Sequence, residues 1–198
     1  MRRNKLNKMG FPEEFGLYDP NNEHENCGFG FIANIKNEPK HEIVHQALEI
    51  VHHLDHRGAI GADPLAGDGA GILIQIPHDF FKQEFVNTGI KLPEIGDYGV
   101  GMVFLPPDKD KANLAIDAIE NAIKNEGQNL IGWRNVPIDN TVLGETVKNN
   151  TPIIKQFFIK KGDSSITEKE FQRKLYVIRK QSLLSSKIQI AYIENFFC

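Results

Sequence analysis

The chain has 198 residues, of which 40% are hydrophobic and 25% are charged. This composition is that of an ordinary globular domain and excludes a collagen-like, low-complexity or membrane-spanning protein. The formal net charge of −3 gives no overall electrostatic reason to expect nucleic acid or an anionic membrane surface as a partner. The two cysteines, Cys27 and Cys198, do not make a disulfide framework and suit a reducing compartment, so we expect a cytoplasmic protein.

Residues 1–26 are polar and rich in turn-forming residues, so we expect a leader segment and a domain boundary after Asn26. The leader has no apolar run long enough for a signal peptide, and no later segment approaches a membrane span. From Gly28 to Ile35, small and large apolar residues alternate, which predicts a strand buried on both faces. Cys27 would then stand at the head of this strand.

Between His41 and His56, apolar residues recur at intervals of three and four without an interrupting Gly or Pro. This spacing predicts an amphipathic helix that ends before Arg57. A glycine-rich turn, Gly67–Gly71, follows and leads into an apolar run over 72–77, for which we expect a second buried strand.

The remainder of the chain alternates strand and helix patterns. Thr167 and Glu170 are spaced as a capping box, which marks the start of the last helix. The expected elements are strands at 99–105, 130–136 and 153–159 and helices at 109–126 and 167–179. Mixed strands and helices of this kind predict an α+β sandwich.

Cys27 is the residue with the clearest chemical potential. If the leader is removed between Asn26 and Cys27, the cysteine gains a free α-amine with a pKa of about 7.7–8.0 beside a thiol with a pKa of about 8.5. The amine can then take the thiol proton at neutral pH, so one residue supplies both nucleophile and base. Without further information, a buried cysteine that packs as a small hydrophobe is the default interpretation.

Four blocks of sequence, in order, resemble the large subunit of glutamate synthase. The run Asn26-Cys27-Gly28-Phe29-Gly30-Phe31-Ile32-Ala33 resembles its processed amino terminus, which begins with a catalytic cysteine. The other blocks are His56-Arg57-Gly58-Ala59 with Ala62-Asp63, then Gly67-Asp68-Gly69-Ala70-Gly71-Ile72, and Gly132-Trp133-Arg134-Asn135-Val136-Pro137 with Asn140-Thr141-Val142-Leu143-Gly144-Glu145. The resemblance runs from about Leu17 to about Lys180 and points to the N-terminal class II glutamine amidotransferase domain of that family.

The resemblance implies a partial glutamine amidotransferase type-2 domain over 27–198, with an N-terminal-nucleophile (Ntn) hydrolase-like αββα sandwich that is incomplete at its C-terminus. Cys27 would attack the side-chain amide of glutamine and form a glutamyl thioester. Arg57 would hold the α-carboxylate of the substrate in a bidentate pair, although the residue alone favours a role at the helix end. Asp68 would contact the substrate amine or cap its own turn, and the residue alone favours the cap.

The resemblance also implies partners and cofactors. The released ammonia would serve glutamate synthesis from 2-oxoglutarate in other domains of the parent enzyme, and a small subunit is left open. We expect no cofactor in this chain and FMN and an iron–sulfur cluster in the full-length parent. Because we find no convincing equivalent of the family's later Asn-Gly oxyanion pair, we expect this truncated chain alone to have little or no activity.

Two further functions stay open: another class II amidotransferase, such as one that makes phosphoribosylamine or glucosamine phosphate, and an inactive fragment. The Gly67–Gly71 turn does not indicate nucleotide binding, because it lacks the Lys-Ser/Thr of a P-loop and precedes an expected strand instead of a helix. His52 and His56 have a spacing that suits metal ligands, but no third ligand supports them, so we expect no metal site. Trp133 and Arg134 serve as markers of the fold, with Trp133 expected in the core.

Overall fold

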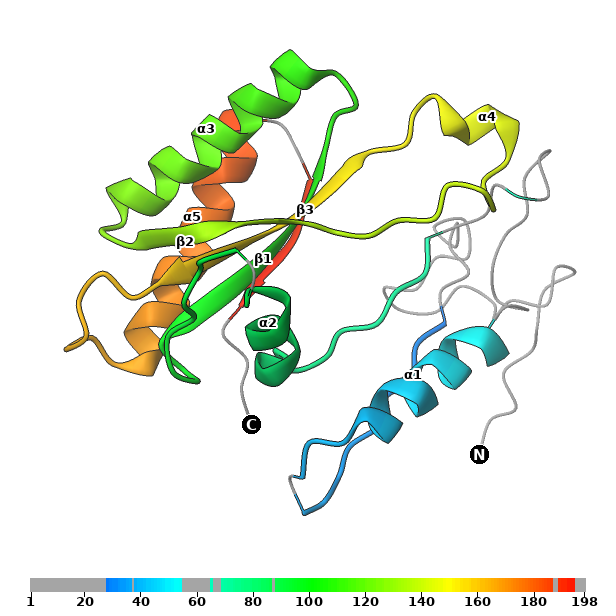
Figure 1. Cartoon of the computed structure of the whole chain (residues 1–198), viewed down its shortest axis with the longest axis horizontal. Coiled ribbons are helices and arrows are strands. Elements are labelled where there is room, and N and C mark those ends of the chain that lie inside the picture. The colour runs from blue at the N-terminus through cyan, green and yellow to red at the C-terminus, as the bar shows by residue number, and fades with distance from the viewer. Residues whose placement is uncertain are drawn as a thin grey trace, which may run out of the picture.

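The structure is a computed structural model that describes residues 28–36, 38–54, 65, 69–86, 88–186 and 189–194, with 185–186 and 189–194 described by their backbone alone. Figure 1 shows the arrangement of its helices and strands. In chain order these are α1 (His41–His53), α2 (His78–Glu84), β1 (Tyr98–Leu105), α3 (Lys109–Asn125), β2 (Asn129–Asn135), α4 (Glu145–Lys148), β3 (Ile153–Lys160), α5 (Glu168–Ser186) and β4 (Gln189–Glu194).

The four described strands form one sheet in the order β2-β3-β1-β4, and each neighbouring pair is antiparallel. Helices α3 and α5 lie together on one face of this sheet, and α2 lies on the other (Figure 1). An antiparallel sheet with helices gathered on its faces agrees with the α+β class expected from the sequence.

The larger hydrophobic core lies between the sheet and the pair α3 and α5. Helix α3 buries apolar residues spaced three and four apart, which puts them on one face of the helix. Strand alternation sends Phe157 and Ile159 of β3 to the same side, where they meet Phe171 and Ile178 of α5. Each such side chain, fully buried, contributes about 1.5–3 kcal/mol, so this layer supplies much of the folding energy.

The smaller core lies on the opposite face, beneath α2. Phe81 and Phe85 are one helical turn apart, and both meet Phe158 of β3 edge to face, with ring centroids 4.9 and 4.8 Å away. Tyr98 and Val100 of β1 complete the buried cluster. Helix α2 is therefore held to the sheet by aromatic packing against one strand residue.

A bulge in β2 decides which of its residues reach each core. Leu130 pairs with Ile159 and Gly132 pairs with Phe158, so Ile131 is the extra residue in the ladder. As a result, Leu130 and Trp133 both pack on the larger core, while Ile131 packs on the smaller one. The expectation that Trp133 belongs to the core is confirmed.

The elements with strong periodicity are confirmed: α1, α3, α5, β1, β2 and β3 occupy the expected stretches, and α5 continues past Arg179 to Ser186. The expected strands at 28–35 and 72–77 are wrong, because residues 28–34 and 69–77 have no regular secondary structure. Phe29 and Phe31 are 91% and 85% exposed instead of buried. A strand needs a neighbouring strand for its backbone hydrogen bonds. The described sheet consists of the four strands β1, β2, β3 and β4 and includes neither of these segments.

Three short elements, α2, α4 and β4, were not anticipated. The first two are too short for periodicity to reveal them. Strand β4 lies beyond Lys180, where the resemblance ends, yet it pairs with β1 in the sheet.

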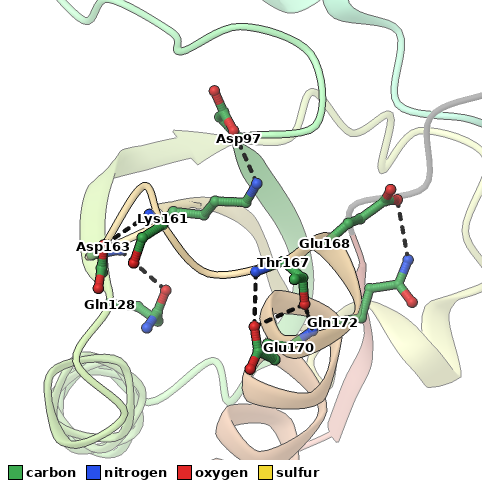
Figure 2. Close-up of polar contacts among 10 residues, drawn as sticks. Asp97, Gln128, Lys161, Asp163, Thr167, Glu168, Glu170 and Gln172 are labelled. Carbon is green, nitrogen blue, oxygen red and sulfur yellow. Dashed lines mark hydrogen bonds and ion pairs between the residues drawn. The ribbon is translucent and has the colours of Figure 1, made fainter.

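A polar network closes the connection between β3 and α5 (Figure 2). Gly162 N–H donates to the Gln128 side chain at 3.2 Å, and Lys161 pairs with Asp97 at 3.0 Å. A Cβ on Gly162 would lie 1.7 Å from the carbonyl oxygen of Gly127. The turn after β3 and the turn after α3 are therefore in contact through their backbones, which only glycine allows.

The capping box at the start of α5 is confirmed. Thr167 N–H donates to Glu170 Oε2 at 2.8 Å, and Glu170 N–H donates back to Thr167 Oγ1 at 3.3 Å (Figure 2). Two otherwise unpaired backbone donors are thereby satisfied. The Glu170 carboxylate accepts hydrogen bonds from the backbone N–H of Thr167 and, at 2.8 Å, from its hydroxyl, and these two bonds, the backbone one first, lower the pKa of Glu170 because they favour its charged form.

The contact between the two turns predicts that Gly162→Ala destabilises the protein. The added methyl group must push the backbone of Gly127 away, at a cost of about 1–3 kcal/mol. Urea unfolding monitored by circular dichroism measures this cost. Gly71→Ala is the matched control, since a Cβ there meets nothing within 4 Å. An unchanged midpoint for Gly162→Ala would contradict the described contact.

The capping box predicts a pH dependence of stability. Since the pKa of Glu170 is lower in the folded chain than in the unfolded one, its contribution is complete above the unfolded pKa and disappears as the pH falls through the folded pKa. Wild-type stability should therefore fall more steeply than that of Glu170→Gln between about pH 5 and about pH 3. Unfolding curves across this range test it, with Glu168→Gln as the control. Parallel profiles for wild type and Glu170→Gln would refute the prediction.

Candidate functional site

The three expected site residues, Cys27, Arg57 and Asp68, lie outside the residues that the structure describes, as does His56. Their roles therefore stay predictions. The structure does describe chain segments next to each of them: residues 28–36, the end of α1, and residues 69–77. The geometry available for the site is that of these flanking segments and of the sheet.

The segment that follows Cys27 lies against α1. Gly30 is so close to Ile50 of this helix that a Cβ on Gly30 would lie 2.5 Å from Ile50 Cγ2. The chain then turns back toward the helix at Asn34, whose side chain accepts from Lys36 N–H at 2.8 Å and donates to Glu38 O at 3.2 Å. The segment after the expected nucleophile and the helix that leads to Arg57 are thus in contact.

The same region carries apolar side chains that the described structure leaves uncovered. Helix α1 buries none of its residues, although its apolar residues follow a helical period. Phe29, Phe31 and Leu73 are exposed as well. An apolar surface of this kind, divided between three segments, is typical of a face that packs against further structure.

Arg134 joins three elements on the face of the sheet beneath α2. Its Nε donates to Glu84 Oε2 at 2.9 Å, a second guanidinium nitrogen pairs with the same carboxylate, and a third donates to Gln156 Oε1 at 3.0 Å. The guanidinium also lies 5.4 Å from the ring centroid of Phe80. This set of contacts needs the planar fork of an arginine. The sequence marked Arg134 only as a feature of the fold, because its partners come from α2 and β3.

Tyr98 and His78 form a second polar contact on this face. The Tyr98 hydroxyl lies 3.1 Å from His78 Nδ1, and the ring of Tyr98 is buried. Burial raises the pKa of Tyr98 to about 12, so the phenol stays protonated at neutral pH and serves as a hydrogen-bonding group, not as a base. The sequence offered no motif that would have identified this pair.

A shallow groove of about 360 Å³ lies between α3 and α5. Its walls contain aliphatic side chains, amides and one carboxylate, and no thiol or imidazole. Such a lining does not provide a nucleophile and base for amide hydrolysis. The groove is lined by Leu114, Asp117, Ala118, Asn121, Ala122, Asn125 and Gln181.

The described part of the chain supports neither metal binding nor nucleotide binding. No group of three or more His, Cys, Asp or Glu residues lies there in an arrangement that could hold a metal ion, and His52 is exposed. Residues 72–77 form no strand, so the expectation that a strand follows the Gly67–Gly71 run is wrong, but the missing Lys-Ser/Thr still speaks against a P-loop. None of the described helices has the length and apolar character needed to cross a membrane.

Comparison with known proteins gives a consistent result. Residues 27–198 match the model of the class-II glutamine amidotransferases. The chain is 44% identical over 171 residues to the glutamate synthase (NADPH) large chain of Bacillus subtilis (strain 168), which covers 86% of this chain and 11% of that protein. It is 38% identical over 195 residues to glutamate synthase (NADH) of Saccharomyces cerevisiae, covering 94% of this chain and 9% of that protein.

A plant relative extends the comparison. The chain is 35% identical over 187 residues to ferredoxin-dependent glutamate synthase 1 of Arabidopsis thaliana, which covers 94% of this chain and 12% of that protein. The chain thus spans about a tenth of the length of these relatives. The resemblance to glutamate synthase that the ordered sequence blocks indicated is confirmed. The chain belongs to the class-II glutamine amidotransferases, as an N-terminal amidotransferase domain of the glutamate synthase type.

Proposed function

We propose that this chain is the glutaminase part of a glutamate synthase, which hydrolyses glutamine and supplies ammonia for glutamate synthesis from 2-oxoglutarate. The observation that carries this proposal is the family match, which begins at the expected nucleophile and runs from residue 27 to residue 198. The relatives described above are glutamate synthases that use NADPH, NADH or ferredoxin by name. They favour this function over another class II amidotransferase.

The proposed reaction uses Cys27 after removal of residues 1–26. Its α-amine takes the thiol proton, and the sulfur bonds to the side-chain carbonyl carbon of glutamine. The proton then passes to the leaving nitrogen, the C–N bond breaks, and ammonia departs from a glutamyl thioester. Water attacks this thioester, which releases glutamate and restores the thiol. All groups required for proton transfer reside on one residue.

Arg57 and Asp68 position the substrate in this proposal, through its α-carboxylate and α-amine respectively. The contact between Gly30 and Ile50 supports the placement of Cys27 and Arg57 near the same substrate molecule. Gly30 is three residues from Cys27 and Ile50 is seven residues from Arg57, stretches that span at most about 11 and about 25 Å. Both residues are thus tied by short stretches of chain to two segments in contact.

We propose that the domain is an αββα sandwich in which a second sheet packs beside α1 and the exposed apolar side chains near it. The uncovered apolar side chains of Phe29, Phe31 and Leu73 support this. Helix α1 would cover the outer face of the second sheet, which accounts for its amphipathic sequence. The FMN and iron–sulfur chemistry would belong to the rest of the parent enzyme.

Replacement of the nucleophile tests the function directly. In the full-length enzyme, Cys27→Ala should lower glutamine hydrolysis by roughly 10³-fold or more, because no other residue supplies the thioester sulfur. Glutamate synthesis from added ammonium should persist. Cys198→Ala is the control and should hydrolyse glutamine normally. Continued hydrolysis by Cys27→Ala, or an intact mass that retains residues 1–26 in active enzyme, would rule out the proposed mechanism.

The carboxylate-binding role of Arg57 makes a second prediction. Arg57→Lys should lower kcat/KM for glutamine by roughly 10- to 100-fold, chiefly through KM, since an ammonium group cannot form the bidentate pair. Steady-state kinetics with glutamine measure the change. Arg173→Lys, on an exposed position of α5, should behave as wild type. If Arg57→Lys leaves KM unaltered, Arg57 has only a structural role.

A further inference from the structure

Residues 28–34 lie alongside helix α1, and we refer to the two together as the hairpin (Figure 1). Polar contacts hold the turn between them, where the Asn34 side chain accepts from Lys36 N–H at 2.8 Å and donates to Glu38 O at 3.2 Å. Lys40, the N-cap residue of α1, pairs with the Glu38 carboxylate at 2.8 Å. The turn is therefore tied to the first residues of the helix.

The contact between Gly30 and Ile50 lies at nearly the same distance from the turn along both halves of the hairpin. Gly30 is four residues before Asn34, and four extended residues span about 13 Å. Ile50 is nine residues after His41, the first residue of α1, and nine helical residues rise by about 14 Å. The two halves therefore run along each other without slack, and this contact fixes the end of the hairpin that is remote from the turn.

The contact leaves no room for a side chain on Gly30. A Cβ there would lie 2.5 Å from Ile50 Cγ2, whereas two carbon atoms prefer a separation of about 3.5–4.0 Å. The φ of Gly30 lies outside the left-handed region, so the contact and not the backbone conformation requires glycine. Ile50 cannot turn its methyl group away, because a β-branched side chain in a helix has one strongly preferred χ1 rotamer. An added methyl group would thus separate the two halves by about 1 Å.

We propose that Gly30 and Ile50 are positioning residues for glutamine hydrolysis, and that their contact sets the distance between the nucleophile Cys27 and the substrate held by Arg57. This inference rests on the function proposed above. Cys27 is three residues before Gly30, and Arg57 follows the helix that carries Ile50, so a change at the contact is passed to both by short stretches of chain. Attack on the amide needs reacting atoms about 3–3.5 Å apart, and a misplacement of about 1 Å can cost about 100-fold in rate.

Steady-state kinetics of the full-length enzyme test the proposal. Gly30→Ala should lower kcat for glutamine hydrolysis by roughly 10- to 100-fold and leave KM nearly unchanged, since Arg57 and Asp68 still bind the substrate. The assay is run where circular dichroism shows each variant fully folded, and intact mass verifies that the chain begins at Cys27. Gly162→Ala is the matched control, because its methyl group also meets a close neighbour but in the turn after β3, and it should keep the wild-type kcat. A wild-type kcat for Gly30→Ala overturns the proposal.

Two double variants show whether the contact itself is responsible. Gly30→Ala/Ile50→Ala should regain most of the lost kcat, because the Cγ2 methyl group that the new Cβ meets is gone. Gly30→Ala/Ile50→Val should not, since valine keeps both branches at its Cβ. Equal kcat values for the two double variants overturn the proposal, and this pair also decides if Gly30→Ala alone yields no active enzyme.

The nucleophile variant separates this inference from the proposed function. Continued hydrolysis by Cys27→Ala refutes the function and the positioning role together. An inactive Cys27→Ala beside a fully active Gly30→Ala refutes the positioning role alone.

Discussion

The described fold depends on two consecutive phenylalanines in β3. Strand alternation directs Phe157 and Phe158 to opposite faces of the sheet, and both are completely buried. Phe157 lies in the larger core with its ring 5.0 Å from that of Trp133, while Phe158 receives Phe81 and Phe85 of α2. Because β3 lies between β1 and β2, one strand thus joins both layers of side chains to the sheet.

The two faces of this sheet are covered to different extents. Helices α3 and α5 cover one face of the sheet with the apolar side chains along their inner faces. On the other face, α2 and the Arg134 contacts cover the region around Phe158. The segments that flank Cys27 and Asp68 carry exposed apolar side chains, and α1 buries none. Among the described residues, packing is therefore least complete in the segments that flank the expected site residues.

The sequence by itself determined the elements with strong periodicity and the family. Helical spacing located α1, α3 and α5, and the residues Thr167 and Glu170 located the start of α5, because these signals arise within one element. The ordered blocks around Cys27, Arg57 and Asp68 identified the amidotransferase, although not the geometry of its site. Only the tertiary structure decided the bulge at Ile131, the partners of Arg134, and the absence of strands at 28–34 and 69–77 within the described residues. Alternation shows that a segment suits a sheet, but the backbone hydrogen bonds that make it a strand come from a neighbour that the local sequence does not specify.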